Sequence, residues 1–137
     1  MRSVSRTDSH MTKRLYFTVL HLLFLVACSG STAETRLQSH FQLSRVGTPE
    51  EIERELITKV GAQASEQSIY KFLDRSRIGS DGLSSYCPAD SEGLIVCRIE
   101  LDPHSAGIVK SSYGLFFQLD EQRRLKSLAV KKWLTGP

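Results

Sequence analysis

One short segment of the chain gathers residue types that could perform acid–base chemistry, Asp102-Pro103-His104-Ser105. In a loop between two strands, its carboxylate and imidazole could hold and transfer a proton. Turns also recruit Asp, Pro and Ser, because these residues fix or hydrogen-bond the local backbone. No Ser/His/Asp set, HExxH motif, glycine-rich phosphate loop or pair of active carboxylates can be assembled from local motifs in the sequence. We therefore expect no enzyme activity and no cofactor.

Cys28 has a different context, because it directly follows an apolar segment. Lys13-Arg14 precedes a 13-residue stretch, Leu15 to Ala27, that two polar residues interrupt. A transmembrane helix needs about 20 apolar residues to cross a hydrocarbon core of roughly 30 Å, so this stretch is too short to span a bilayer. A basic start followed by a short apolar region is typical of a cleaved signal peptide. Met11 lies shortly before the basic pair, and we expect it to be the true start.

The residues Leu25-Val26-Ala27-Cys28 resemble the lipobox of bacterial lipoproteins. The resemblance implies that the Cys28 thiol carries a diacylglyceryl group, that the signal peptide 1–27 is removed, and that the new amino group is acylated. Each buried methylene contributes about 0.8 kcal/mol to membrane binding, so this anchor would hold the protein on a membrane. Ser29, in place of Asp, resembles the pattern of lipoproteins exported to the outer membrane. We expect the periplasmic face of the outer membrane, with inner-membrane retention as the alternative.

Cleavage before Cys28 changes the charge of the protein. Residues 1–27 carry four basic side chains and one acidic side chain, so a chain of formal charge +3 becomes neutral, with 14 residues of each sign. Nucleic-acid-binding domains normally present a basic face, so we expect no nucleic-acid partner. The 110 residues that remain suffice for one domain. We expect residues 28–46, rich in Ser and Thr, to form a lipidated tether and residues 47–137 to form the domain. The alternative is that part of the tether lies against the domain, because Phe41 and Leu43 alternate.

Cys87 and Cys97 remain as an even pair once Cys28 carries lipid, and the periplasm is oxidising. A bridge between them would close a loop of about ten residues and stabilise the fold by about 2.5–3 kcal/mol in the chain-entropy model. We predict this disulfide, with two buried free thiols as the alternative. His40 and His104 lie at no metal-binding spacing from the cysteines, so we expect no zinc site.

The hydrophobic pattern predicts two helices in the first half of the domain. Thr48-Pro49-Glu50-Glu51 provides an N-cap, a first-turn proline and the glutamate of a capping box. Apolar residues then recur at helical spacing until Gly61, which is placed to end the helix. A second helix is predicted over about 65–77, where the turn Gly79-Ser80-Asp81-Gly82 follows.

Beyond this turn, the apolar period changes from helical spacing to alternation, which is typical of half-buried strands. The alternation predicts strands over 95–101, 113–119 and about 125–133. Two helices packed on a three-stranded antiparallel meander form an α+β fold. One face of such a sheet packs on the helices, while the other meets water or a partner.

Three segments resemble the small outer-membrane lipoproteins of the BamE/SmpA type and the related β-lactamase-inhibitor-like proteins. They are Gly47-Thr48-Pro49-Glu50-Glu51-Ile52, Phe117-Gln118-Leu119-Asp120 and residues 125–130. The resemblance spans about residues 46–134 and implies the same α+β architecture on a lipidated tether. The chain departs from the BamE pattern in its long second helix and in its extra cysteine pair.

The alternation also assigns side chains to the predicted open face of the sheet. Val96, Phe116 and Trp133 would point away from the helices, which suits a protein partner. The alternative is that the N-terminal linker or the loop 83–93 covers this face. Lys131 and Lys132 belong to a basic group, which either protects the sheet edge against strand pairing or contacts lipid head groups, peptidoglycan or an acidic partner. That group consists of Arg123, Arg124, Lys126, Lys131 and Lys132.

These features together favour a membrane-anchored binding or scaffolding module of an envelope complex. The partner would be a membrane protein that contacts the open face of the sheet. An immunity protein or inhibitor that neutralises a periplasmic toxin or hydrolase is the alternative, because a small neutral α+β lipoprotein would serve either role. No residue pattern in the sequence names the partner.

Overall fold

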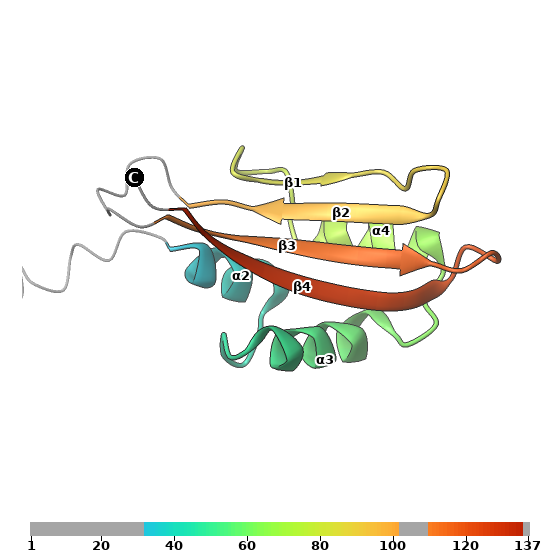
Figure 1. The fold of residues 1–137 in the computed structure, drawn as a ribbon, viewed down its shortest axis with the longest axis horizontal. Coiled ribbons are helices and arrows are strands. Elements are labelled where there is room, and N and C mark those ends of the chain that lie inside the picture. The colour runs from blue at the N-terminus through green and yellow to red at the C-terminus, as the bar shows by residue number, and fades with distance from the viewer. Residues whose placement is uncertain (1–31, 102–109, 136–137) are drawn as a thin grey trace, which may run out of the picture. The chain divides into compact units, whose positions relative to one another are not determined.

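A computed structural model of the chain describes residues 32–101 and 110–135. Cys28 and the cluster Asp102-Pro103-His104-Ser105 therefore lie outside the described residues. Within those two ranges the chain forms three helices and then four strands (Figure 1). The helices are α2 (Ala33–Phe41), α3 (Pro49–Val60) and α4 (Glu66–Arg75), and the strands are β1 (Ser84–Cys87), β2 (Leu94–Ile99), β3 (Lys110–Leu119) and β4 (Leu125–Thr135).

The structure confirms an α+β fold with helices that precede an antiparallel sheet, and it corrects the number of elements. The strand order is β1-β2-β3-β4, so each strand pairs with its neighbour in sequence. The prediction of two helices and three strands missed α2 and β1 in the described part of the chain. All three helices lie on one side of the sheet, as Figure 1 shows.

The start of α3 forms as the sequence predicts. The Thr48 side chain accepts a hydrogen bond from the Glu51 amide at 3.3 Å, and the Glu51 carboxylate accepts one from the Thr48 amide at 2.9 Å. This reciprocal capping box satisfies two backbone donors that the first helical turn would otherwise leave unpaired. Ile52 and Leu56 lie on the buried face of the helix, and Gly61 follows its last residue.

Helix α2 occupies the segment that we expected to be a tether. Thr32 caps its N-terminus, and Gln42 ends it in the left-handed conformation. Its buried stripe is Ala33, Leu37 and Phe41, one residue per turn. The Phe41 ring stacks on Phe72 of α4, with 5.4 Å between the ring centroids. The prediction was wrong here because so narrow a stripe lies among polar residues, and no capping box or proline marks its start.

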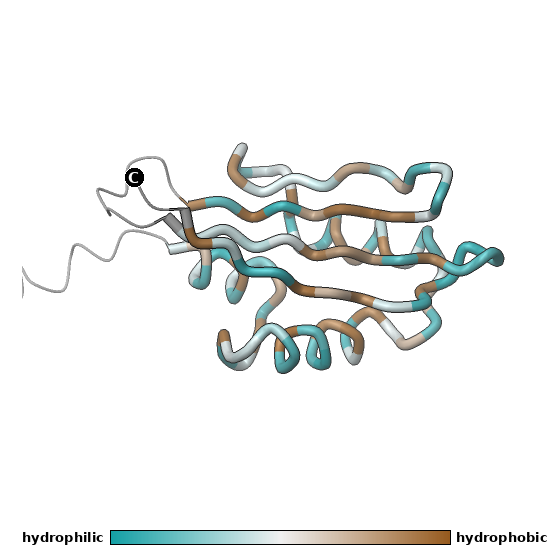
Figure 2. The backbone as a smooth tube through the Cα atoms, viewed as in Figure 1, coloured by the Kyte–Doolittle hydropathy of each residue, from teal (hydrophilic) through white to brown (hydrophobic). Residues whose placement is uncertain are grey.

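The sheet follows the predicted alternation closely. Ile95, Leu115 and Val130 are buried among the helices, whereas their neighbours Val96, Phe116 and Ala129 are only half-buried. Figure 2 shows the hydrophobic stretches along the central strands. The buried side chains of the strands and helices form one core beneath the sheet.

Strand β1 pairs with β2 at the sheet edge, with Tyr86 opposite Cys97. Its four residues, Ser84-Ser85-Tyr86-Cys87, give too short and too polar a pattern to predict a strand. A short edge strand is a common means of limiting strand pairing between molecules. In the described ranges, no helix combines the length and the apolar character that crossing a bilayer requires.

Substitution Leu37→Ala tests whether α2 belongs to the core. Leu37 is fully buried, and removal of such a side chain typically costs about 2–5 kcal/mol, because it forfeits burial and leaves a cavity. We expect that loss in the free energy of unfolding, measured by urea denaturation of the Cys28→Ser protein. Ser39→Ala on the exposed side of α2 is the matched control and should change stability little. Equal stability of the two variants would show that 33–41 is a tether after all.

Candidate functional site

The side of the sheet that faces away from the helices is the candidate site, and we call it the open face. Strand pairing aligns its side chains in rows across the strands. One row runs Cys87, Val96, Phe116 and Ala129, and the next runs Ser85, Arg98, Gly114 and Lys131. The remaining members are Leu94, Ser112, Gln118, Ser127 and Trp133.

An aromatic cluster extends from the middle of the open face, at Phe116, toward the end of β4, at Trp133. The Phe116 and Trp133 rings meet edge to face, with 6.0 Å between centroids and 73° between planes. The Lys131 ammonium lies 5.3 Å from the Phe116 ring centroid, within cation–π range. Both Val96 and Phe116 are half-buried, and Trp133 is 42% exposed. The cluster therefore presents apolar surface to solvent in a fixed arrangement.

Gly114 makes this arrangement of Trp133 feasible. A Cβ atom at position 114 would lie 2.4 Å from the Trp133 ring and 3.0 Å from the Phe116 ring. Only glycine lets the indole lie across the backbone of a central strand at this distance. In return, the indole covers Gly114, which is buried although it lies on the open face. Gly114 is therefore needed for the close approach of the Trp133 ring to the β3 backbone.

The predicted partner surface is largely together in the structure. Val96, Phe116, Trp133 and Lys131 all lie on the open face, as the alternation predicts. Lys132 does not, because adjacent residues of a strand point to opposite faces. Its ammonium instead lies 2.6 Å from the Glu34 carboxylate of α2.

The described parts of the two segments that we considered as a cover leave the aromatic cluster open, although the Glu92 carbonyl oxygen of loop 83–93 accepts a hydrogen bond from the open-face Gln118 side chain at 2.9 Å. Residues 33–41 pack into the core on the helix side. Residues 84–87 extend the sheet at its edge, in register with β2. No other segment among the described residues covers the aromatic cluster. The aromatic cluster is thus open to solvent in this part of the chain.

The structure corrects the predicted disulfide, since both Cys87 and Cys97 are free. Cys97 pairs with Tyr86 and points into the core, whereas Cys87 pairs with Val96 and points to the open face. Side chains on opposite faces cannot join without a one-residue shift of β1 against β2. Burial raises the pKa of the Cys97 thiol to about 12.

Sequence reasoning missed a cluster of catalytic residue types that lies between α2 and β1. The Ser84 hydroxyl is 2.9 Å from His40 Nε2, and His40 Nδ1 is 2.8 Å from the Ser76 carbonyl oxygen. Asp81 contacts the same Nε2 at 3.3 Å and pairs with Arg36. No local motif could reveal the cluster, because 44 residues separate His40 from Ser84.

The geometry of this cluster fits a structural role. Ser84 is only 1% exposed, so a substrate cannot reach its hydroxyl. Asp81 contacts the ring nitrogen that faces the serine, so it does not orient the imidazole from behind as a catalytic triad requires. Burial opposes ionisation of Asp81, yet amide hydrogen bonds from Leu83 and Ser84 and the Arg36 charge hold its pKa below the usual range. The cluster fastens α2 to the start of β1.

Other polar groups of the described residues also serve the fold. Arg123, part of the predicted basic group, binds the Glu66 carboxylate through two nitrogens at 2.7 and 2.8 Å. Glu53 of α3 accepts a hydrogen bond from the Val130 amide at 2.8 Å, which covers part of the β4 edge. The described ranges contain no group of three His, Cys, Asp or Glu side chains that could hold a metal ion.

Comparison with known proteins adds no assignment: no protein-family model, curated protein or solved structure matches the chain.

The two thiols should differ in reactivity. With iodoacetamide at pH 8, we expect Cys87 to be alkylated in the folded protein, because it is exposed, and Cys97 only after unfolding, because it is buried and its pKa is raised. Mass spectrometry of protein kept oxidised during purification gives the readout, and Cys87→Ser provides the matched control. A protein that resists alkylation at both positions until it is reduced would restore the disulfide.

Proposed function

We propose that the protein is a lipid-anchored binding module on the periplasmic face of the outer membrane, without enzyme activity. The open face is its binding surface, and the partner is a membrane protein of an envelope complex. The anchor is the Cys28 lipid that the lipobox resemblance implies. The single observation that carries the binding role is the aromatic cluster, which no described segment covers.

The composition of this face supports a protein partner. Interface centres are enriched in aromatic residues and arginine and are surrounded by polar residues. Phe116, Trp133 and Val96 supply the apolar centre here, while Arg98, Ser112 and Gln118 surround it. The glycine beneath Trp133 and the ring contact with Phe116 hold the indole in place, so less conformational freedom is lost on binding.

We also propose that the protein has no catalytic activity. The Ser84 and Asp81 side chains both contact the His40 ring, and the Ser84 hydroxyl is buried. A depression of about 620 Å³ lies by the hairpin that joins β3 to β4, and Gln118, Arg123 and Lys126 are among the residues that line it. None of Ser84, His40 and Asp81 lines this depression.

Site-specific crosslinking in living cells tests the proposal. A photoreactive phenylalanine analogue at Phe116 should capture one envelope membrane protein, because this position is central on the open face. The same analogue at Arg54, on the exposed side of α3, is the matched control and should capture none. The captured protein is identified by mass spectrometry.

Three results would contradict this proposal. Capture at Arg54 but not at Phe116 would move the binding surface to the helices. Capture of a secreted toxin or hydrolase, only in the presence of a toxin-bearing neighbour, would favour the immunity role instead. A purified domain that hydrolyses an envelope substrate would overturn both roles.

A further inference from the structure

The end of β4 carries an unusual pair of side chains. Trp133 is 42% exposed and Leu134 is 66% exposed, and they are the large apolar residues that remain exposed in the described ranges. Adjacent strand residues point to opposite faces, so one side chain lies on each side of the sheet. This end of the sheet therefore exposes an apolar side chain on each of its two faces.

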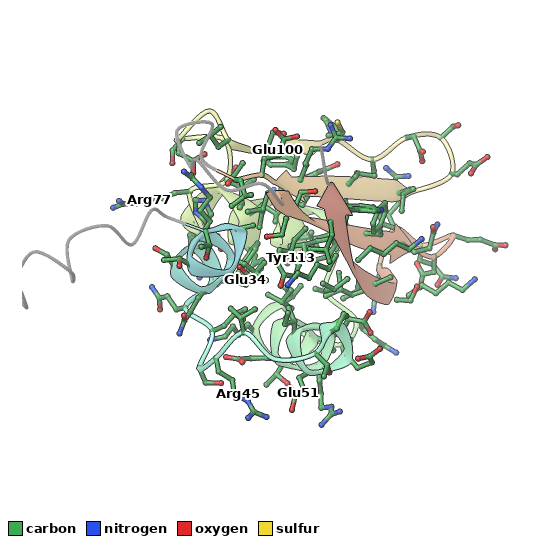
Figure 3. All side chains as sticks on the ribbon, turned by 60° about the vertical axis from the view of Figure 1, so that its left-hand side comes forward. Glu34, Arg45, Glu51, Arg77, Glu100 and Tyr113 are labelled. Carbon is green, nitrogen blue, oxygen red and sulfur yellow. The ribbon has the colours of Figure 1, made fainter. Side chains whose placement is uncertain are left out.

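Helix α2 begins at the same end of the sheet. The Glu34 carboxylate, in the first turn of α2, lies 2.6 Å from the Lys132 ammonium and 3.5 Å from the Tyr113 hydroxyl. Figure 3 shows Glu34 beside Tyr113, and in Figure 1 the start of α2 lies close to the end of β4. Since α2 is part of the core, this point is fixed relative to the sheet.

Chain length then limits how far this end can be from the proposed anchor. Thr32, the N-cap of α2, is four positions after Cys28 in the chain. Even a fully extended chain of that length spans at most about 14 Å. The expected tether of 28–46 would have allowed a far larger separation. The start of α2 must therefore remain within about 14 Å of the lipidated residue, whatever path the connecting residues take.

We propose that the end of the sheet formed by Trp133 and Leu134 contacts the lipid bilayer and that this contact orients the domain. The inference rests on the proposed anchor at Cys28. A bilayer is the partner that the short connection brings to these two side chains in every anchored molecule. Tryptophan prefers the head-group region, where its ring is half-buried and its N–H stays hydrated.

The charge at the end of the sheet near Trp133 is weakly positive, which suits a lipid surface. Five charged groups belong to this end: the Arg98–Glu100 and Lys132–Glu34 ion pairs, at 3.7 and 2.6 Å, and Lys131. The Lys132 bond holds the pKa of Glu34 below its usual range, so this carboxylate stays ionised and paired. One net positive charge remains among these five groups. The contact should therefore depend on Trp133 and Leu134 more than on anionic lipid.

This contact would set the orientation of the open face. Strands that point with one end toward the bilayer hold both faces of the sheet upright on the membrane. Val96 and Phe116 would then face sideways, along the membrane surface. That direction suits a membrane-protein partner whose periplasmic part stands beside the anchor.

Fluorescence of Trp133 tests the inference directly, because the chain contains one tryptophan. The full lipidated protein is reconstituted in vesicles of phosphatidylethanolamine and phosphatidylglycerol, with or without bromine on the acyl chains. We expect a blue-shifted emission relative to the Cys28→Ser protein in buffer, and a loss of intensity with the brominated lipids. Leu134→Ser should reduce that quenching.

A matched variant moves the probe to the far end of the open face. In Trp133→Phe/Leu94→Trp the indole lies six residues along the strands, about 20 Å, from its native position. This variant should show no quenching by brominated lipids. Vesicles without other proteins ensure that the signal does not arise from a protein partner.

The outcomes separate this inference from the proposed function. A protein that carries acyl mass and floats with the vesicles, but whose Trp133 is not quenched, overturns the bilayer contact and leaves the anchor intact. Equal quenching at positions 133 and 94 also overturns it, because the domain would then lie flat on its open face. A protein without acyl mass that does not float overturns the anchor and the contact together.

Discussion

The register between β3 and its two neighbours is the constraint on which the rest of the structure depends. Leu115 and Phe117 point into the core, so Phe116 must point away from it. The same alternation on both neighbouring strands gathers the apolar side chains beneath the sheet, where three helices bury them. A shift of one residue would exchange the two faces, so burial fixes the register strongly. The open face and its aromatic cluster follow from that register.

The sequence predicted this core arrangement because its signals are local and strong. The capping box at Thr48 and the alternation around Phe116 need no knowledge of the rest of the chain. Helix α2 and strand β1 were missed because each is short and polar in sequence and is held by distant contacts. His40 bonded to Ser84 and Phe41 stacked on Phe72 are two such contacts. They appear only when the chain is folded.

The cysteine pair shows where composition misleads. An even count and an oxidising compartment favour a disulfide, but they carry no information on side-chain direction. The pairing of Tyr86 with Cys97 places the two thiols on opposite faces, and that pairing depends on a strand the sequence did not predict. The positions of the residues proposed for a partner surface were predicted better: Val96, Phe116, Lys131 and Trp133 share one face of the sheet, and only Lys132 lies on the other. Its ion pair with α2 is again a contact distant in sequence.

In the proposed function, a lipid anchor, an upright sheet and an exposed aromatic surface act together as one binding module. Complementation of a deletion strain with Val96→Thr/Phe116→Thr tests most directly whether this function resides on the open face. Threonine keeps the preference for strands and removes most of the apolar surface, and unfolding of the purified variant verifies that it is folded. We expect the wild-type protein to restore the permeability barrier of the envelope, and we expect this variant, present at equal level, not to restore it. A variant that restores the barrier as fully as the wild type would contradict this proposal.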